Sequence, residues 1–215
     1  MVSIIKFCGI TNKNDLIHAI QCGATHIGFV LEPSSPRCIT PQLTSKLIRF
    51  LPPTVSSVAV YKEINQDTLA HHSSYFTPHF IQADAVHFST LTLPPLVQAL
   101  KVYRNCDPHH NPCPPNGAPY LFEGMHSGAG ELCDLILASK SAKQGKLILA
   151  GGLNPNNMTE MIQKVRPYGI DVSSGIESSP GVKSLEKMGR KIGGMVSQCI
   201  LVNLLVYRNR GYGWW

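Results

Sequence analysis

Short apolar runs recur along this chain, and most are separated by segments whose apolar residues have helical spacing. The first run, residues 4–8, ends in Cys-Gly, and residues 14–20 then carry apolar side chains on one face of a helix. The runs that we predict as strands are 4–8, 26–31, 55–61, 80–88, 101–103, 120–123, 146–150 and 169–172. Strands that alternate with helices predict an α/β fold, and this number of units predicts a single-domain (βα)8 TIM barrel. An open doubly wound sheet is the alternative.

Capping residues support several of the helices between these strands. Thr40 followed by Pro41 is typical of a helix N-terminus, and Gly23 is typical of the residue that ends a helix. Asn154 followed by Pro155 predicts another N-terminus after the seventh strand. We predict further helices over 65–72, 94–99 and 184–196.

One connection lacks a helical pattern. Residues 105–117 contain four prolines, which remove backbone donors and break helices. We therefore expect the helix after the fifth strand to be irregular or missing. The apolar segment 199–215 ends in Gly-Tyr-Gly-Trp-Trp and fits no further strand–helix unit. We assign residues 1–198 to the barrel and residues 199–215 to a C-terminal tail whose structure the pattern leaves open.

Composition narrows the classes of function. The 215 residues are 43% hydrophobic, enough for one full core, and the formal net charge is +6. This charge suits an anionic small molecule, whereas the scattered Lys and Arg residues form no basic patch for nucleic acid. Seven irregularly spaced cysteines, after an N-terminus that reads as a strand rather than a signal peptide, predict free thiols in the cytoplasm. No apolar run is long enough to cross a membrane.

Three side chains near the ends of predicted strands are candidates for acid–base chemistry and substrate binding. Active sites of such barrels lie at the C-terminal ends of the strands, where we place Cys8 and Glu123. A thiol and a carboxyl group form a candidate base and acid, and a helix start after Cys8 would stabilise its thiolate. Arg37 follows the second strand and suits a bidentate contact with a carboxylate. The alternatives are a buried structural cysteine, a solvated carboxylate and a surface arginine.

Glycines and serines after the last two strands predict a phosphate site. Gly151-Gly152 follows the seventh strand, and Ser173-Ser174-Gly175 follows the eighth. In barrels these two loops commonly bind phosphate through backbone N–H groups and a short helix N-terminus. Each pair alone is also consistent with a tight turn, whereas their occurrence together favours phosphate.

A cluster of sulfur and imidazole side chains lies in the proline-rich connection. It comprises Cys106, His109, His110 and Cys113. Its spacing matches no zinc-binding pattern, so we expect no metal.

Longer motifs surround the same strand ends. They are Lys6-Phe7-Cys8-Gly9-Ile10-Thr11, Gly28-Phe29-Val30 with Pro33-Ser34-Ser35-Pro36-Arg37, Gly151-Gly152-Leu153-Asn154-Pro155-Asn156-Asn157 and Asp171-Val172-Ser173-Ser174-Gly175-Ile176-Glu177. Together they resemble the phosphoribosylanthranilate isomerase family from residue 4 to about residue 190. The resemblance implies a (βα)8 barrel without a cofactor. It also implies an Amadori rearrangement in tryptophan biosynthesis, from N-(5-phosphoribosyl)anthranilate to 1-(2-carboxyphenylamino)-1-deoxyribulose 5-phosphate.

The resemblance also implies roles for individual residues. In the family a cysteine at the position of Cys8 is the general base, and an aspartate after the sixth strand is the general acid. Cys8 is therefore expected to remove a proton from C2′ of the substrate, and Glu123 to protonate the ribose ring oxygen. Arg37, Asp171 and the glycine and serine loops are expected to bind the substrate.

The sequence departs from the family pattern between the fourth and sixth strands. Glu123 stands where the family has aspartate, and a carboxyl group displaced by about 1 Å can cost roughly 100-fold in rate. Neither 81–84 nor 85–88 reproduces the family's Gln-Leu-His-Gly motif, and 127–131 has an acidic residue where the family has lysine. The alternatives to an active isomerase are a catalytically impaired or repurposed phosphate-binding barrel and another phosphosugar enzyme on this fold. A monomer and a homodimer both remain open.

Overall fold

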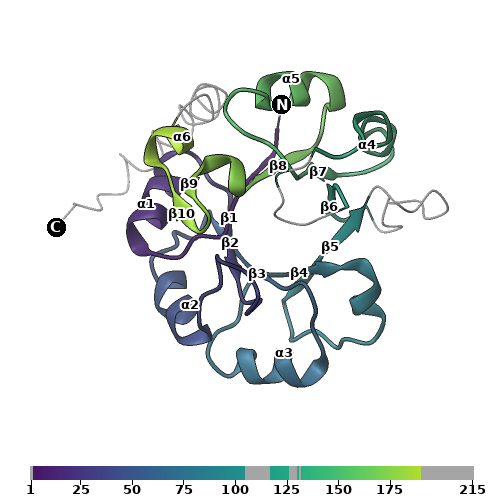
Figure 1. Ribbon diagram of the computed structural model, residues 1–215. Helices are drawn as coiled ribbons and strands as arrows, with labels where there is room; N and C mark the ends of the chain where they lie inside the picture. Colours follow the sequence, from purple (N-terminus) through teal and green to yellow (C-terminus); the bar gives the residue numbers. More distant parts are fainter. Residues whose placement is uncertain (1, 105–116, 126–129, 131, 190–215) are drawn as a thin grey trace.

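Within the part of the chain that the structure describes, eight parallel strands form a closed barrel. The computed structural model describes residues 2–104, 117–125, 130 and 132–189. Each barrel strand pairs with the next, and β1 also pairs with β8, which closes the sheet (Figure 1). The strands are β1 (Ile4–Cys8), β2 (His26–Val30), β3 (Ser56–Val60), β4 (Phe80–Asp84), β5 (Gln98–Arg104), β6 (Tyr120–Glu123), β7 (Leu147–Leu149) and β8 (Gly169–Val172). The (βα)8 barrel is thus confirmed, and the open doubly wound sheet is excluded.

Helices surround the barrel on its outside (Figure 1). They are α1 (Lys13–Gln21), α2 (Pro41–Ile48), α3 (Gln66–Ser73), α4 (Leu135–Ala142), α5 (Met158–Val165) and α6 (Leu185–Gly189). The predicted cap of α2 is confirmed, because the Leu43 N–H donates to Thr40 Oγ1 at 3.2 Å. Gly23, directly after the C-cap of α1, has a left-handed φ of +88°. Among the described helices, none combines the length and the apolar character needed to span a membrane.

The predicted fourth strand is too long, and the helix predicted after it is wrong. Strand β4 ends at Asp84, and a 3-10 turn, η1 (Ala85–Ser89), follows it. Residues 94–99 do not form a helix, since two prolines open the segment and Leu96 has a left-handed φ of +68°.

Strand β5 occupies part of the segment predicted as helical. It begins at Gln98, and its buried residues Leu100 and Val102 alternate with more exposed ones. This period of two is the signal of a strand, and it extends beyond the predicted residues 101–103.

Three further features differ from the sequence prediction or extend it. Helix α4 was not predicted, and neither was the antiparallel hairpin of β9 (Glu177–Ser179) and β10 (Val182–Lys183). Helix α5 begins at Met158 rather than at Pro155, because Asn154 Oδ1 accepts hydrogen bonds from the N–H groups of a turn that precedes the helix. The predicted helix 184–196 is described only as α6. Segments 105–116 and 199–215, with the domain boundary at residue 198, lie outside the described residues.

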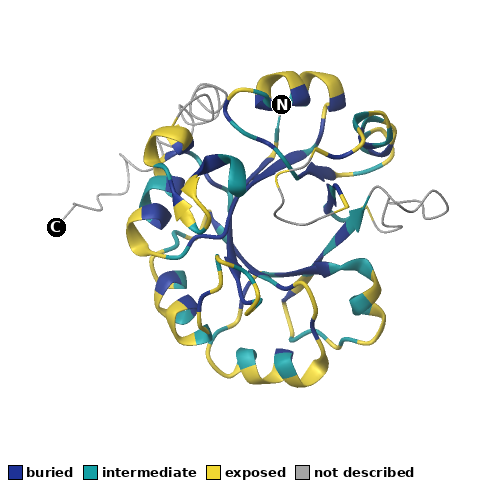
Figure 2. Cartoon of the chain, viewed as in Figure 1, coloured by how far each residue is buried: buried dark blue, intermediate teal, exposed yellow. Residues whose placement is uncertain are grey.

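The core has one part inside the barrel and a larger part between the strands and the helices. The interior part is apolar and comprises Ile4, Val58, Leu100, Val102, Leu121, Ile148 and Ala150. Figure 2 shows the strands as the most continuously buried elements, with the outer faces of the helices exposed. Apolar side chains fill much of the barrel interior. The polar side chains that point into the barrel therefore lie near the C-terminal ends of the strands.

Candidate active site

The interior face of β1 changes from apolar to polar along the strand. Side chains on a strand alternate between its two faces, so Ile4, Lys6 and Cys8 share the interior face. Ile4 packs in the apolar interior cluster, whereas Lys6 and Cys8 bring an amine and a thiol toward the opening. Lys6 is the register partner of Asp171 on β8. The ends of β1 and β8 therefore form one wall of the candidate site.

Lys6 connects the groups on this wall. Its Nζ lies 2.9 Å from Asp171 Oδ2, and the two side chains are 0% and 8% exposed. Gly28 on β2 leaves space for the thiol and the amine: a Cβ there would lie 2.8 Å from Cys8 Sγ and 3.1 Å from Lys6 Nζ. Among the described residues, Asp171 Oδ1 is buried without a hydrogen-bond partner. That oxygen is suited to accept a hydrogen bond from a ligand hydroxyl.

Burial and neighbouring charges set the protonation of the thiol and the amine. Burial raises the pKa of Cys8 above its ordinary value, Lys6 opposes this shift, and Asp171 reinforces it. For Lys6, burial lowers the pKa, but Asp171 and Cys8 outweigh burial, so the net shift is upward. Helix α1 begins at Lys13 rather than directly after Cys8. The expected stabilisation of the thiolate by this helix start stays a prediction, whereas Lys6 and, to a smaller extent, Lys183 are cations that favour the thiolate.

Arg37 lies beside the opening of the barrel and is already paired. Its Nε donates to Glu177 Oε1 and its Nη2 to Glu177 Oε2, both at 2.8 Å. Lys183 Nζ donates to the same Oε1 at 2.8 Å. Burial raises the pKa of Glu177, but hydrogen bonds from these two cations outweigh burial and the net shift is downward. Arg37 thus makes its bidentate contact with Glu177, and only its Nη1 edge lies outside this pair.

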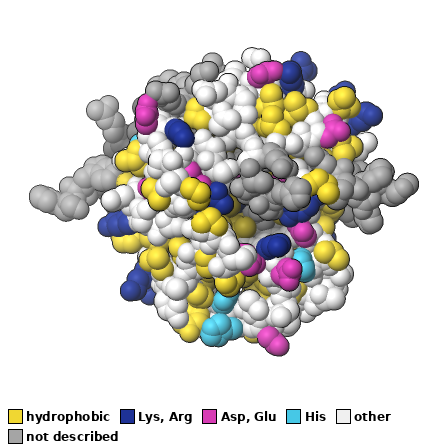
Figure 3. Space-filling model, viewed as in Figure 1, with side chains coloured by type: hydrophobic (Ala, Val, Ile, Leu, Met, Phe, Trp, Pro, Cys, Tyr) yellow, Lys and Arg dark blue, Asp and Glu magenta, His cyan; other side chains and the backbone are white. Residues whose placement is uncertain are grey.

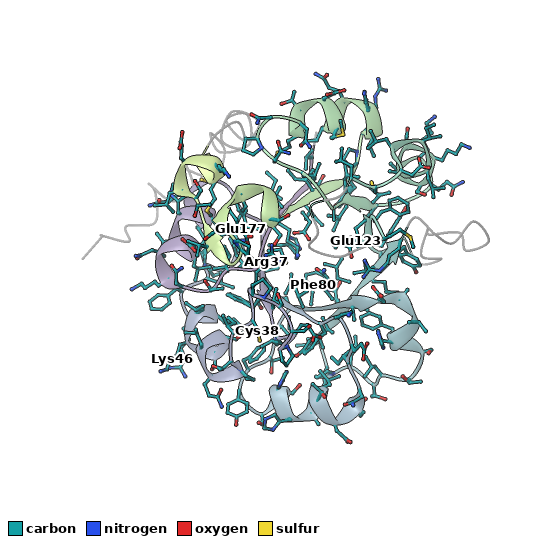
Figure 4. All side chains as sticks on the ribbon, viewed as in Figure 1. Arg37, Cys38, Lys46, Phe80, Glu123 and Glu177 are labelled. Atoms are coloured by element: carbon teal, nitrogen blue, oxygen red, sulfur yellow. The ribbon has the colours of Figure 1, made fainter. Side chains whose placement is uncertain are left out.

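Glycine makes the placement of Arg37 possible. A Cβ at Gly9, whose φ is +73°, would lie 2.6 Å from Arg37 Cδ. Figure 4 shows Arg37 and Glu177 together on one side of the opening. The β9–β10 hairpin that carries Glu177 and Lys183 therefore completes this side of the site.

Glu123 lies on the other side of the opening, at the end of β6 (Figure 4). Its Oε1 accepts a hydrogen bond from Arg104 Nη1 at 2.5 Å, and Arg104 Nη2 donates to Asp84 Oδ1 at 2.7 Å. Burial lowers the pKa of Arg104, but Glu123 and Asp84 outweigh burial and the net shift is upward. Figure 3 shows basic side chains beside acidic ones around the centre of this face.

The glycine loops after β7 and β8 are packed against each other. Gly151 and Gly152 have φ angles of +83° and +63°, which favour glycine. The Asn157 side chain donates to the Gly152 carbonyl at 2.9 Å and fixes this loop. A Cβ at Gly175 would lie 1.9 Å from the Leu153 carbonyl oxygen. Only glycine therefore allows the loop after β8 to approach the loop after β7 so closely.

The two serines after β8 have different surroundings. Ser173 Oγ donates to the Cys8 carbonyl at 3.2 Å, which joins this loop to the end of β1. Ser174 begins a short 3-10 turn, η2 (Ser174–Ile176), and a Cβ at Gly130 would lie 3.7 Å from its Oγ. The short helix predicted after the serines is thus a single turn. The first N–H groups of such a turn lack intrahelical partners and suit a phosphate.

The structure adds charged residues to which the sequence patterns assigned no role. They are Lys6, Asp84, Arg104, Glu177 and Lys183. Several of them lie within or at the end of an apolar run. A charged residue in such a position was the sequence signal that could have identified them as site residues. Among the described residues, no group of three or more His, Cys, Asp or Glu side chains suits a metal ion. The cluster at residues 106–113 lies outside the described part of the chain.

Comparison with known proteins gives one consistent result. The family model for N-(5′-phosphoribosyl)anthranilate (PRA) isomerase matches residues 5–192. The N-(5′-phosphoribosyl)anthranilate isomerase of Chlorobium phaeovibrioides is 36% identical over 203 residues, which cover 85% of this chain and 92% of that relative. The phosphoribosyl anthranilate isomerase structure from Thermus thermophilus is 28% identical with a TM-score of 0.77, covering 91% of this chain and 99% of that one.

A second solved structure contains a ligand. It is a phosphoribosyl anthranilate isomerase in complex with reduced 1-(o-carboxyphenylamino)-1-deoxyribulose 5-phosphate. It is 26% identical with a TM-score of 0.69, and the match covers 89% of this chain and 97% of that one. The barrel, the paired loops and these matches agree, and the chain belongs to the N-(5′-phosphoribosyl)anthranilate (PRA) isomerase family.

Proposed function

We propose that Cys8 is the general base and Glu123 the general acid of the aldose–ketose isomerisation for which this family is named. The substrate is N-(5-phosphoribosyl)anthranilate, and the product is 1-(2-carboxyphenylamino)-1-deoxyribulose 5-phosphate, an intermediate of tryptophan biosynthesis. The observation that carries the assignment is the position of the two side chains. Both end interior faces of barrel strands, Cys8 on β1 and Glu123 on β6, which lie on different sides of the barrel (Figure 1) beside two packed glycine loops.

Each group has one proton to move. Glu123 donates a proton to the ribose ring oxygen, the C1′–O bond breaks, and the anthranilate nitrogen forms a Schiff base with C1′. The Cys8 thiolate then removes the proton from C2′, which gives an enolamine. The enolamine tautomerises to the ketone, so atoms balance and no oxidant or cofactor is required. Lys6 supports the second step because its positive charge favours the thiolate over the thiol.

The remaining residues bind the substrate. We assign the phosphate to the loops that contain Gly151, Gly152 and the segment 173–175, because their packing brings half-buried glycine and serine residues together at one point of the rim. The buried Asp171 Oδ1 is placed to accept a hydrogen bond from a ribose hydroxyl. The Nη1 edge of Arg37 is left for the anthranilate carboxylate, while Glu177 fixes the rest of the guanidinium.

A fluorescence assay tests the assignment directly. The anthranilate fluorescence of the substrate disappears on rearrangement, so turnover is followed continuously in the wild type, Cys8→Ala and Glu123→Gln. We expect turnover by the wild type and a loss of at least about 100-fold in each variant. Absence of turnover in the wild type would reject the isomerase assignment. Wild-type activity in Glu123→Gln would reject Glu123 as the acid and leave the rest of the site in place.

A second candidate is a barrel that binds phosphorylated ligands without turnover. It is favoured by the ion pairs that occupy Glu123 and Arg37, and by the burial that keeps the Cys8 thiol protonated. This candidate predicts that the reduced product binds to the wild type while the fluorescence of the substrate stays constant. In either case we propose a small phosphorylated ligand, no nucleic-acid partner and a cytoplasmic location.

A further inference from the structure

Charged side chains end three consecutive strands on one wall of the barrel. Asp84, Arg104 and Glu123 close β4, β5 and β6, and their side chains are 34%, 19% and 12% exposed. We propose that Arg104 is a positioning residue for Glu123, which fixes the carboxyl group and sets the pH range in which it donates a proton. The proposal rests on the role of Glu123 given above.

The guanidinium of Arg104 binds Asp84 along one edge and Glu123 through its remaining nitrogen. Its Nη2 donates to Asp84 Oδ1 at 2.7 Å, and its Nε lies 3.4 Å from Asp84 Oδ2. Its Nη1 donates to Glu123 Oε1 at 2.5 Å, and Arg104 and Glu123 are register partners in the sheet. A planar guanidinium held along one edge by Asp84 has a fixed direction at its third nitrogen, Nη1, which also donates to the Gly124 carbonyl at 3.5 Å. Asp84 therefore orients Arg104, and Arg104 orients Glu123.

A glutamate in this position needs such support. Its side chain has one more rotatable bond than aspartate, so an unrestrained carboxyl group samples positions more than 1 Å apart. A misplacement of about 1 Å can reduce the rate roughly 100-fold. The ion pair with Arg104, in a partly buried setting, removes this freedom at the strand end where the proton is delivered.

The charge of Arg104 also acts on proton transfer. The reactive state requires a protonated carboxyl group and a deprotonated thiol. Because burial raises the pKa of Cys8, the thiol titrates at a higher pH than a carboxyl group. The rising acid limb of the kcat/KM profile then reports the carboxyl group, and the falling alkaline limb reports the thiol. A neighbouring cation favours the charged carboxylate, so Arg104 holds the acid limb at low pH.

The charged groups described near the Arg104–Glu123 pair lie on both walls of the opening. On the same wall, Asp84 is bound to Arg104. Cys133 lies in the segment after β6, and the charge of Glu123 contributes to the raised pKa of its thiol. Across the opening lie Lys6, Cys8, Arg37, Asp171, Glu177 and Lys183. The cations of that group are paired with Asp171 and Glu177.

The pH dependence of the isomerase in Arg104 variants tests the proposal. In Arg104→Met we expect the acid limb of kcat/KM to move up by about one pH unit, and kcat to fall roughly tenfold to a hundredfold. Arg104→Lys should return the limb toward the wild-type position, since it restores the charge. Arg49→Met, which removes an exposed arginine after α2, is the matched control. The ionisations of the substrate are common to all variants, so a difference between profiles reports the protein.

A second variant covers the case in which Arg104→Met fails to fold. Asp84→Asn keeps the positive charge but loosens its anchor, so we expect a lower kcat without an upward shift of the acid limb. An unmoved limb in a folded Arg104→Met, or wild-type kcat in Asp84→Asn, would overturn the proposal while leaving the isomerase assignment intact. Absence of turnover in the wild type, or full activity in Glu123→Gln, would remove the role of Glu123 and this inference with it.

Discussion

Lys6 is the residue whose replacement should disturb both the stability and the chemistry of this barrel. It is fully buried, and its Nζ lies 2.9 Å from the buried Asp171 Oδ2. Lys6→Met keeps most of the side-chain volume but leaves the carboxylate of Asp171 without its cation. Removing one partner of a buried ion pair costs about 3–5 kcal/mol, because the other charge remains in a poorly solvated place.

The double variant separates the charge from the loss of packing. Asp171→Asn in the Lys6→Met background removes the stranded charge, so we expect about 2–3 kcal/mol of the lost stability to return. Urea denaturation followed by circular dichroism gives the unfolding free energies of the four proteins in this cycle. A loss below about 1 kcal/mol in Lys6→Met, or no recovery in the double variant, would refute the argument that the pair is electrostatically coupled.

The same change should alter the thiol. Cys8 Sγ and Lys6 Nζ both lie close to the space that a Gly28 Cβ would fill, within the roughly 4–6 Å over which a cation lowers a pKa by 1–3 units. We therefore expect the pKa of Cys8 to rise further in Lys6→Met, because a cation that favours the thiolate is lost. Iodoacetamide labelling of the Cys8 peptide as a function of pH, quantified by mass spectrometry, measures this shift. An unchanged labelling profile in a folded variant would show that Lys6 does not favour the thiolate.

Three further changes test other parts of the structure. Gly175→Ala places a Cβ 1.9 Å from the Leu153 carbonyl oxygen and should raise KM about tenfold. The control is Gly189→Ala, whose Cβ would lie 3.9 Å from His18 Nε2. Equal KM values in the two variants would contradict the loop contact. Glu177→Gln leaves two cations without a carboxylate, so we expect a loss of about 3–5 kcal/mol in urea denaturation, and an unchanged midpoint would argue against it. Burial lowers the pKa of His26 from 6.5 to about 4. The contribution of His26 to the free energy of unfolding is therefore unaffected by pH above pH 6.5. Between pH 6.5 and 4 the unfolded chain takes up a proton that the folded protein does not, so the free energy of unfolding falls by on the order of 3 kcal/mol. His26→Gln should flatten this part of the stability curve, and an identical slope would refute it.

The alternation of strands and helices made the barrel predictable, because each strand is a short apolar run between strong turn and cap signals. The residues at the strand ends could also be placed, since Cys8 and Glu123 close their strands in the structure as predicted. The segment before β5 failed for a local reason. Its prolines and the left-handed Leu96 are compatible with a turn, and only the period of two from Gln98 reveals the strand.

The hydrophobic and motif patterns of the sequence could not predict which side chains pair with each other. Arg37 was predicted as a free carboxylate-binding residue, but its partner Glu177 is 140 residues away in the sequence. Arg104 joins Glu123 to Asp84 only because three strands end at the same level of the barrel. Glu123, and Asp84 in the segment 81–84 that departs from the family motif, are thus in contact with one guanidinium, a relation that spacing along the chain does not contain.

The space at Gly28 has a consequence for how this site tolerates sequence change. Strand β2 contributes no reactive group beside Cys8, only the absence of a side chain between Sγ and Lys6 Nζ. An alanine there would retain every functional group of the site and yet push the thiol and the amine apart. A survey of mutations confined to residues with reactive side chains would overlook this position, although one added methyl group would displace the Cys8 thiol.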